Sequence, residues 1–248
     1  MKPGLVALLL VAALGLSLGL SGLHRSGVLD RAYSQVVVVA CQGQDVYGTG
    51  WFINHDHVVT AYHVVAECSH PRLIRAPWAS NATVEAYDSE LDIAVLRVAN
   101  PPSWARGIPL TPSVSIGDPV YVIGYPIQLY EETKDLAAMS RIPRVASGTV
   151  SWIHPEKPIF QFDIPTDAGN SGGPVISKRT GGAVGLVVYA RPGIVSEGYF
   201  GLRMDAVAKF LDEHGIEYCV AGNHAGLAVL LGLGAVAALG FLLRGVRP

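Results

Sequence analysis

A serine stands among glycines at residues 169–175, which read Gly-Asn-Ser-Gly-Gly-Pro-Val and lie just ahead of an apolar segment. Glycine neighbours let the backbone turn sharply and aim its amide hydrogens at a developing oxyanion. Ser171 is therefore a candidate nucleophile. A serine attacks a peptide carbonyl near neutral pH only when a histidine takes its proton and a carboxylate orients that histidine. The chemistry predicted at Ser171 requires both partners elsewhere in the chain.

Two upstream residues satisfy this requirement. Residues 60–65 follow an apolar strand directly and place His63 on a short turn or helical piece at the end of that strand. Asp92 lies at the mouth of a buried strand, where its carboxylate is expected to accept the proton on His63 Nδ1 and leave the other ring nitrogen as the base. Asp88 is the alternative carboxylate. We expect His63, Asp92 and Ser171 to act together.

The elements that must position these residues are strands. Between the two ends of the chain, short apolar runs with many β-branched residues are separated by Gly, Pro and Asn, and helical periodicity is nearly absent. This pattern predicts an all-β protein. So many short strands over about 170 residues indicate one or two small antiparallel barrels. The expected strands are 36–39, 48–53, 57–60, 73–75, 83–87, 93–98, 120–123, 148–152, 159–162, 174–176, 183–189 and 199–203.

Two connections are longer than a hairpin turn. Residues 100–119 are rich in proline and are a natural linker between two barrels. Residues 125–145 include a charged run and are expected to form a long polar loop, either functional or a solvated excursion. Residues 205–214 form the one convincing helix outside the terminal apolar segments, with Gly215 placed to cap its end. We expect this helix to pack on the second barrel.

The apolar surplus of the chain sits at its ends. Residues 4–23 and 225–243 carry no charge, and each run is long enough to cross a hydrocarbon core as a helix. The first is expected to be a retained anchor, with a cleaved signal peptide as the alternative. The second is followed by Arg244 and Arg247 and resembles a stop-transfer helix. These features predict a cell-membrane protein whose residues 24–224 lie on the extracytoplasmic side.

The charge pattern excludes some classes of function. The chain has 18 basic and 20 acidic side chains, and some of the basic ones stand at the two ends, so the middle is acidic and shows no clustered basic face. Nucleic-acid binding is therefore not expected. His55 and His57 lie near His63 in sequence, but neighbouring strand positions alternate between faces and no cysteine or carboxylate completes a set, so neither a metal nor a cofactor is expected.

The three cysteines allow one disulfide and one remaining thiol, and an exported compartment permits the bond. Cys41 with Cys68 is the favoured pair, because Cys41 ends a strand and Cys68 lies five residues after His63, so that the bond braces the histidine loop. Three free buried thiols, Cys219 among them, are the alternative. Asn81 begins an Asn-Ala-Thr triplet and is a candidate glycosylation site.

Several motifs together resemble one known family. Residues 60–64 read Thr-Ala-Tyr-His-Val against the family's Thr-Ala-Ala-His-Val, and residues 92–96 match its Asp-Ile-Ala-Val-Leu without change. The nucleophile segment 161–174 follows the family pattern without a gap, and residues 48–53, Gly-Thr-Gly-Trp-Phe-Ile, agree as well. Over residues 35–214 the sequence is similar to the protease domain of HtrA/Deg-type serine proteases, which have the chymotrypsin fold.

The resemblance implies a fold and an oxyanion hole. The expected protease domain, 34–215, contains two chymotrypsin-like antiparallel barrels at about 34–100 and 115–203 and a C-terminal helix, flanked by the two membrane helices. The oxyanion hole is expected from the backbone amides of Gly169 and Ser171. Two residues just upstream, Asp167 and Ala168, differ from the Asn and Pro often found in the family, and a resting loop in a collapsed, inactive form is the alternative.

The resemblance also indicates which residues line the substrate pocket. Pro165 stands where trypsin-like members carry a buried aspartate, and the opposite wall is expected from Val188, Tyr189 and Ala190. A pocket without a fixed negative charge predicts a small or medium apolar side chain before the scissile bond.

The sequence as a whole predicts a membrane-anchored serine endopeptidase that hydrolyses peptides or unfolded proteins through an acyl-enzyme. The family commonly carries a PDZ domain after the protease, and this sequence is expected to lack one. Membrane lipid is an expected partner, and homo-oligomer formation is left open. Two alternatives remain: a catalytically inactive or latent binding module with the same fold, and an esterase that uses the same triad.

Overall fold

The structure, a computed structural model, describes residues 27, 29–44, 46–188 and 198–222. The predicted membrane spans 4–23 and 225–243 lie outside the described residues, as do Tyr189 and Ala190. In the part of the chain that is described, no helix is long and apolar enough to cross a membrane.

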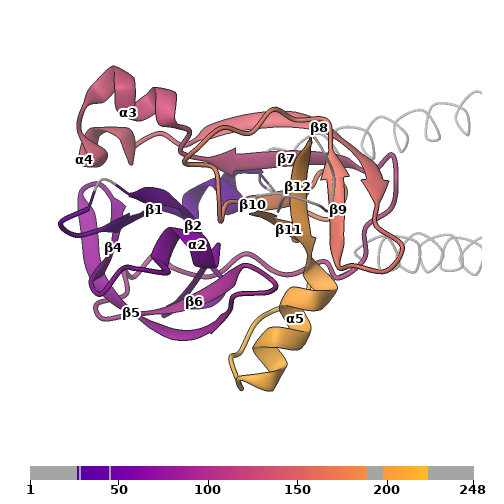
Figure 1. The fold of residues 1–248 in the computed structure, drawn as a ribbon, viewed down its shortest axis with the longest axis horizontal. Coiled ribbons are helices and arrows are strands. Elements are labelled where there is room, and N and C mark those ends of the chain that lie inside the picture. Colours follow the sequence, from indigo (N-terminus) through magenta and orange to yellow (C-terminus); the bar gives the residue numbers. More distant parts are fainter. Residues whose placement is uncertain (1–26, 28, 45, 189–197, 223–248) are drawn as a thin grey trace, which may run out of the picture.

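Two closed antiparallel barrels of six strands each form the body of the protein (Figure 1). The first barrel contains β1 (Val36–Cys41), β2 (Tyr47–Phe52), β3 (His57–Thr60), β4 (Pro71–Arg75), β5 (Trp78–Asp88) and β6 (Ile93–Val98). The second contains β7 (Pro119–Gly124), β8 (Arg144–Ile153), β9 (Ile159–Phe162), β10 (Pro174–Ser177), β11 (Ala183–Val188) and β12 (Tyr199–Arg203). The two barrels share one strand order, β1-β2-β3-β6-β5-β4 in the first and β7-β8-β9-β12-β11-β10 in the second. The predicted all-β, two-barrel fold is confirmed.

Burial on both faces explains the continuous apolar runs in the sequence. Along β1, Val37 and Val39 belong to the core of the first barrel, whereas Val36 and Val38 belong to a second cluster that also contains Ile123 of the other barrel. Alternate residues of a strand point to opposite faces. A strand that is wedged between a barrel interior and the other barrel therefore reads as uninterrupted valine.

The predicted strands are all present, and some are longer than expected. β5 and β8 extend beyond the predicted 83–87 and 148–152 because the added residues pair with a second neighbouring strand, β4 for β5 and β7 for β8. Each strand also contains a register shift, at Val84/Ala86 and at Val150/Trp152, which lets a long strand bend around its barrel. The C-terminal helix is α5 (Met204–Glu213); it lies beside β11 and β12 of the second barrel, and Gly215 follows it in a left-handed conformation with φ +66°.

The expectation of a plain loop at 125–145 is wrong. This connection contains α3 (Ile127–Thr133) and α4 (Leu136–Met139), which lie beside the β1 and β4 end of the first barrel in Figure 1. Asp135 caps α4 by accepting the N–H of Ala137 at 2.8 Å. Leu129 and Leu136 are partly buried and pack against the core between the barrels, so these contacts override the polar local sequence.

Candidate active site

His63 and Asp92 are joined at the end of the first barrel. His63 lies on α2 (Tyr62–Val65), which follows β3, and Asp92 lies in the turn just before β6. The ring Nδ1 of His63 is 2.8 Å from Asp92 Oδ2, and the backbone N–H of His63 donates to Asp92 Oδ1 at 2.9 Å. The Asp92 side chain is 14% exposed and that of His63 is 42% exposed. This geometry is that of a carboxylate that orients an accessible imidazole.

Asp92 also completes the start of α2. The residue before that helix, Ala61, offers no side-chain cap, and the backbone N–H of Tyr62 donates to the carbonyl of Asp92 at 3.1 Å. The first amide hydrogens of a helix have no partner within it. Asp92 supplies partners for two of them, and its own backbone has φ +58°, which is rare outside glycine.

Asp88, the alternative carboxylate, has a different task. Its Oδ1 accepts the backbone N–H groups of Glu90 at 2.7 Å and of Leu91 at 3.0 Å. Asp88 thus shapes the turn that leads into Asp92.

The loop of Ser171 packs against the first barrel beside α2. The carbonyl of Ser171 accepts the N–H of Thr49 on β2 at 2.9 Å. A Cβ placed on Gly172 would lie 2.3 Å from Thr60 Oγ1 and 2.7 Å from the nitrogen of Ala61, so only glycine permits this approach to the residues before His63. The Ser171 hydroxyl and the His63 ring form no hydrogen bond within the described residues, and this contact is often long when substrate is absent.

The peptide groups around the two predicted oxyanion donors are each held by a hydrogen bond. The carbonyl of Ala168 accepts the N–H of Ile127 at 2.7 Å, and the carbonyl of Asn170 accepts the N–H of Gly173 at 2.9 Å. Because N–H and C=O point in opposite directions in a trans peptide, these bonds direct the N–H groups of Gly169 and Ser171 away from Ile127 and Gly173. Neither of these two N–H groups donates to a protein acceptor in the described part of the chain.

Gly169 is required by its conformation. It has φ +92°, and a Cβ at this position would lie 2.2 Å from the carbonyl oxygen of Tyr125. Asp167, one of the two departures from the family pattern, accepts the N–H of Asn170 through its carbonyl at 3.1 Å and the side-chain amide of Gln128 through its carboxylate at 3.0 Å. The loop is therefore tied to α3, where Gln128 lies.

Sequence reasoning missed the residues that hold this loop from the other barrel. Thr49 donates its hydroxyl to the carbonyl of Gly169 at 2.6 Å, and the N–H of Tyr125 donates to the same hydroxyl at 3.0 Å. The available signal was the glycine on each side of Thr49, since glycine inside a strand often marks a close backbone approach.

The predicted pocket residues are only partly described. Pro165 is exposed in the loop after β9, and Val188, 8% exposed, ends β11. Asp163, just upstream, accepts the backbone N–H of Thr149 at 2.6 Å and its hydroxyl at 2.8 Å. These two bonds hold the pKa of the Asp163 carboxyl below its usual value.

The remaining predicted residues lie outside this centre. Cys41 and Cys68 form a disulfide, with the Cα atoms 5.5 Å apart, and Cys219 is an exposed free thiol. Asn81 is exposed on β5. His57 is turned away from His63: its ring Nδ1 lies 2.9 Å from Asp56 Oδ1, and its Nε2 lies 3.1 Å from Glu85 Oε2.

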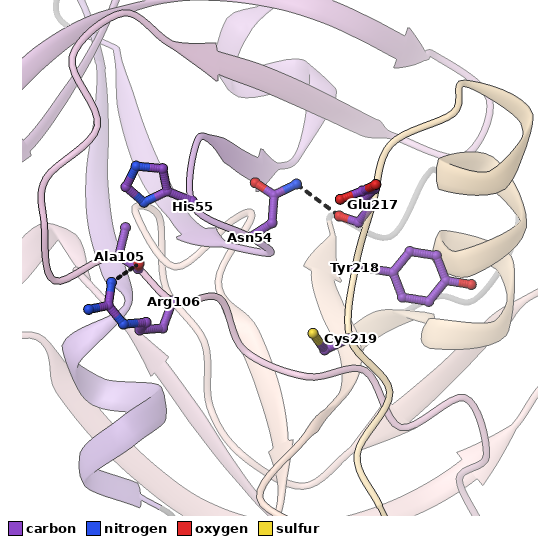
Figure 2. Close-up of a pocket in the computed structure, with 7 residues that line it drawn as sticks. All are labelled: Asn54, His55, Ala105, Arg106, Glu217, Tyr218 and Cys219. Atoms are coloured by element: carbon purple, nitrogen blue, oxygen red, sulfur yellow. Dashed lines mark hydrogen bonds between the residues drawn. The ribbon is translucent and has the colours of Figure 1, made fainter.

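Seven other residues line a separate pocket of about 280 Å³ (Figure 2). His55 and Arg106 stand on one side of it and Glu217 and Cys219 on the other, while the side-chain amide of Asn54 donates to the carbonyl of Glu217 at 2.8 Å. None of His63, Asp92 and Ser171 lines this pocket.

Comparisons with known proteins identify the family of the chain. The sequence pattern described as "Trypsin-like peptidase domain" matches residues 48–186. The chain is 31% identical over 162 residues to "Protease Do-like 1, chloroplastic" of Arabidopsis thaliana. The aligned region covers 63% of this chain and 36% of that protein. It is 30% identical over 145 residues to "Serine protease Rv3671c" of Mycobacterium tuberculosis, covering 56% of this chain and 35% of that protein. The chain thus spans about a third of the length of these two curated relatives.

Solved structures share the fold. The active form of the Rv3671c protease of M. tuberculosis superposes with a TM-score of 0.61 at 24% identity, over 78% of this chain and 86% of that chain. The serine endoprotease of Yersinia pestis superposes with a TM-score of 0.62 at 22% identity, over 77% of this chain and 66% of that chain.

Proposed function

Because the chain belongs to the family of trypsin-like peptidase domains, we propose that it is a serine endopeptidase with Ser171 as its nucleophile and His63 and Asp92 as its partners. The observation that carries this proposal is the pair of hydrogen bonds that the Asp92 carboxylate accepts from the ring and the backbone of His63. With Nδ1 donating to the carboxylate, the lone pair of the other ring nitrogen, Nε2, is free to accept a proton.

The proposed reaction moves one proton through His63 in each half. Nε2 takes the hydroxyl proton as Ser171 Oγ bonds to the peptide carbonyl carbon, and the N–H groups of Gly169 and Ser171 stabilise the oxyanion. The imidazolium then gives its proton to the leaving amine as the C–N bond breaks, which leaves an acyl-enzyme. In the second half His63 takes a proton from water as the water oxygen bonds to the acyl carbon, and it gives that proton to Ser171 Oγ as the ester C–O bond breaks and the carboxylic acid product leaves.

We propose that the substrates are peptides or unfolded protein segments with a small or medium apolar side chain before the scissile bond. Pro165 and Val188 support this specificity, because neither provides a negative charge to pair with lysine or arginine.

We also propose that the protein is anchored in the cell membrane with its protease domain outside the cytoplasm. The uncharged runs 4–23 and 225–243 support this placement, and so does the Cys41–Cys68 disulfide, since such bonds persist in oxidising compartments. Resistance of the full-length protein to alkaline extraction from membranes, compared with a variant that has three lysines within each run, tests the anchoring.

The experiment that tests the activity is covalent labelling of the full-length protein by a fluorophosphonate probe. Labelling needs both an activated serine and a formed oxyanion hole. The modified peptide is mapped, and Ser171→Ala is the control. We expect labelling at Ser171 that disappears in the variant. A folded protein that stays unlabelled in detergent and in lipid would instead be the latent or inactive binding module.

A further inference from the structure

Thr49 is fully buried on β2 of the first barrel, yet its hydroxyl bonds two backbone groups of the second half of the chain. It donates to the carbonyl of Gly169 at 2.6 Å and accepts the N–H of Tyr125 at 3.0 Å. We propose that Thr49 is a positioning residue for the oxyanion hole, which its hydroxyl keeps in the arrangement needed for catalysis. The inference rests on the proposed function, because it assigns Thr49 a part in the reaction at Ser171.

A single peptide group connects the two oxyanion donors. The N–H groups of Gly169 and Ser171 belong to the peptide groups 168–169 and 170–171, and the peptide group 169–170 connects them. The carbonyl of this connecting peptide is that of Gly169, the one that the Thr49 hydroxyl holds. If the connecting peptide rotates, the two donors no longer keep their relative direction.

The local sequence does not hold this peptide by itself. Gly169 has no Cβ and has φ +92°, so steric repulsion within the residue restricts its rotation less than for any other amino acid. A hydrogen bond from a fully buried side chain supplies the restraint that the glycine lacks. Thr49 also holds the carbonyl of Ser171, because its backbone N–H donates to that oxygen at 2.9 Å.

The N–H of Tyr125, the second partner of the Thr49 hydroxyl, determines where the hydroxyl proton points. A threonine hydroxyl has one proton to donate, and the N–H of Tyr125 occupies one of its acceptor positions. The proton therefore goes to Gly169 O. Tyr125 itself lies two residues before Ile127, whose N–H holds the carbonyl of Ala168 at 2.7 Å. Thr49 thus contacts both the loop and the segment that supports the loop from the other side.

The test compares three variants of the full-length protein. Thr49→Val removes the hydroxyl and keeps the shape, and Thr49→Ser keeps the hydroxyl. The matched control is Ser80→Ala on β5, because the buried Ser80 hydroxyl also donates to a carbonyl, that of Asn81 at 2.9 Å, and accepts an N–H, that of Asn100 at 3.0 Å. Ser80 belongs to the same barrel and bonds no residue of the Ser171 loop.

For Thr49→Val we expect both the rate of labelling by the fluorophosphonate and kcat for a peptide substrate to fall about 10- to 100-fold, with KM changed less than about threefold. Thr49→Ser is expected to restore most of kcat. Ser80→Ala is expected to lower the melting temperature without slowing labelling. Should Thr49→Val not fold, Thr49→Cys replaces it, because a thiol is a weaker donor of similar size and its rate is expected to lie below that of Thr49→Ser.

Each outcome separates this inference from the proposed function. If the unmodified protein is not labelled at Ser171, the proposed function is wrong and so is any catalytic part for Thr49. If the unmodified protein is labelled and Thr49→Val is labelled equally fast, the endopeptidase proposal stands and the hydroxyl only stabilises the fold. A parallel loss of stability and rate in both Thr49→Val and Ser80→Ala would also overturn the inference.

Discussion

The carboxylate of Asp92 bonds His63 at two atoms, with Oδ2 at 2.8 Å from the ring Nδ1 and Oδ1 accepting the backbone N–H at 2.9 Å. The Asp92 side chain therefore both orients the His63 ring and attaches α2 to the barrel. Asp92 does this from a backbone conformation with φ +58°, which costs about 1–2 kcal/mol for a residue with a Cβ. The three hydrogen bonds to α2 offset that cost.

Asp92→Asn is expected to lower kcat by about 10⁴-fold while the protein stays folded. The amide has only one acceptor oxygen, so it cannot accept from both the ring and the backbone of His63, and the ring is driven to the wrong tautomer. Steady-state cleavage of a peptide substrate measures the loss. Asp88→Asn is the control, since Asp88 bonds only backbone groups of its own turn in the described structure; an equal loss in that variant would contradict the assignment.

Gly169→Ala is expected to abolish fluorophosphonate labelling at Ser171. The new methyl group would lie 2.2 Å from the carbonyl of Tyr125 at φ +92°, so the loop must move and the oxyanion donors move with it. Gly117→Ala has nearly the same φ, +84°, but no atom within 4 Å of the new Cβ. The control variant should lose some stability and keep its labelling rate; if Gly169→Ala keeps its rate too, the oxyanion hole lies elsewhere.

Pro165→Asp is expected to shift cleavage toward substrates with lysine or arginine before the scissile bond. The new carboxylate would provide the negative charge that the predicted pocket lacks. Cleavage of a peptide library by the variant and by the unmodified protein, with Pro165→Asn as the uncharged match, measures the preference. An unchanged preference would mean that Pro165 does not line the pocket.

Asp163→Asn is expected to lower stability at neutral pH and to have little effect in acid. The N–H and hydroxyl of Thr149 hold the pKa of this carboxyl below its usual value of 3.8. A carboxyl whose pKa is lowered by folding stabilises the protein at pH values above its usual pKa. This contribution is lost as the pH falls through the lower pKa of the folded state. Urea unfolding at a series of pH values measures it. Thr149→Val, which removes the hydroxyl bond alone, should give an intermediate effect, and a difference that persists in strong acid would refute the explanation.

Removal of the disulfide in the double variant Cys41→Ser, Cys68→Ser is expected to cost about 2–4 kcal/mol of the free energy of unfolding. The bond joins cysteines 27 positions apart and so restricts the unfolded chain. Cys219→Ser, at the exposed free thiol, is expected to leave stability unchanged. Urea denaturation under non-reducing conditions compares the variants, and equal stability of all three proteins would mean that the bond does not form.

Local patterns in the sequence determined the strands and the order of the candidate catalytic residues. Four strands, β3, β6, β9 and β12, have the predicted bounds, because alternation, β-branched residues and turn-forming residues act over a few positions of the chain. The sequence motifs around His63, Asp92 and Ser171 were equally local. The Cys41–Cys68 pair followed from the expectation that Cys68 lies in the histidine loop.

Only the tertiary structure decided what holds these residues in place. Thr49 and Gly169 are 120 positions apart, and no local pattern links a threonine in one barrel to a carbonyl in the other. The helices α3 and α4 were missed for the same reason, since their partly buried leucines pack against residues far away in the sequence. Hydrogen bonds and burial between distant segments depend on how the two barrels pack, and that packing is settled only when the whole core forms at once.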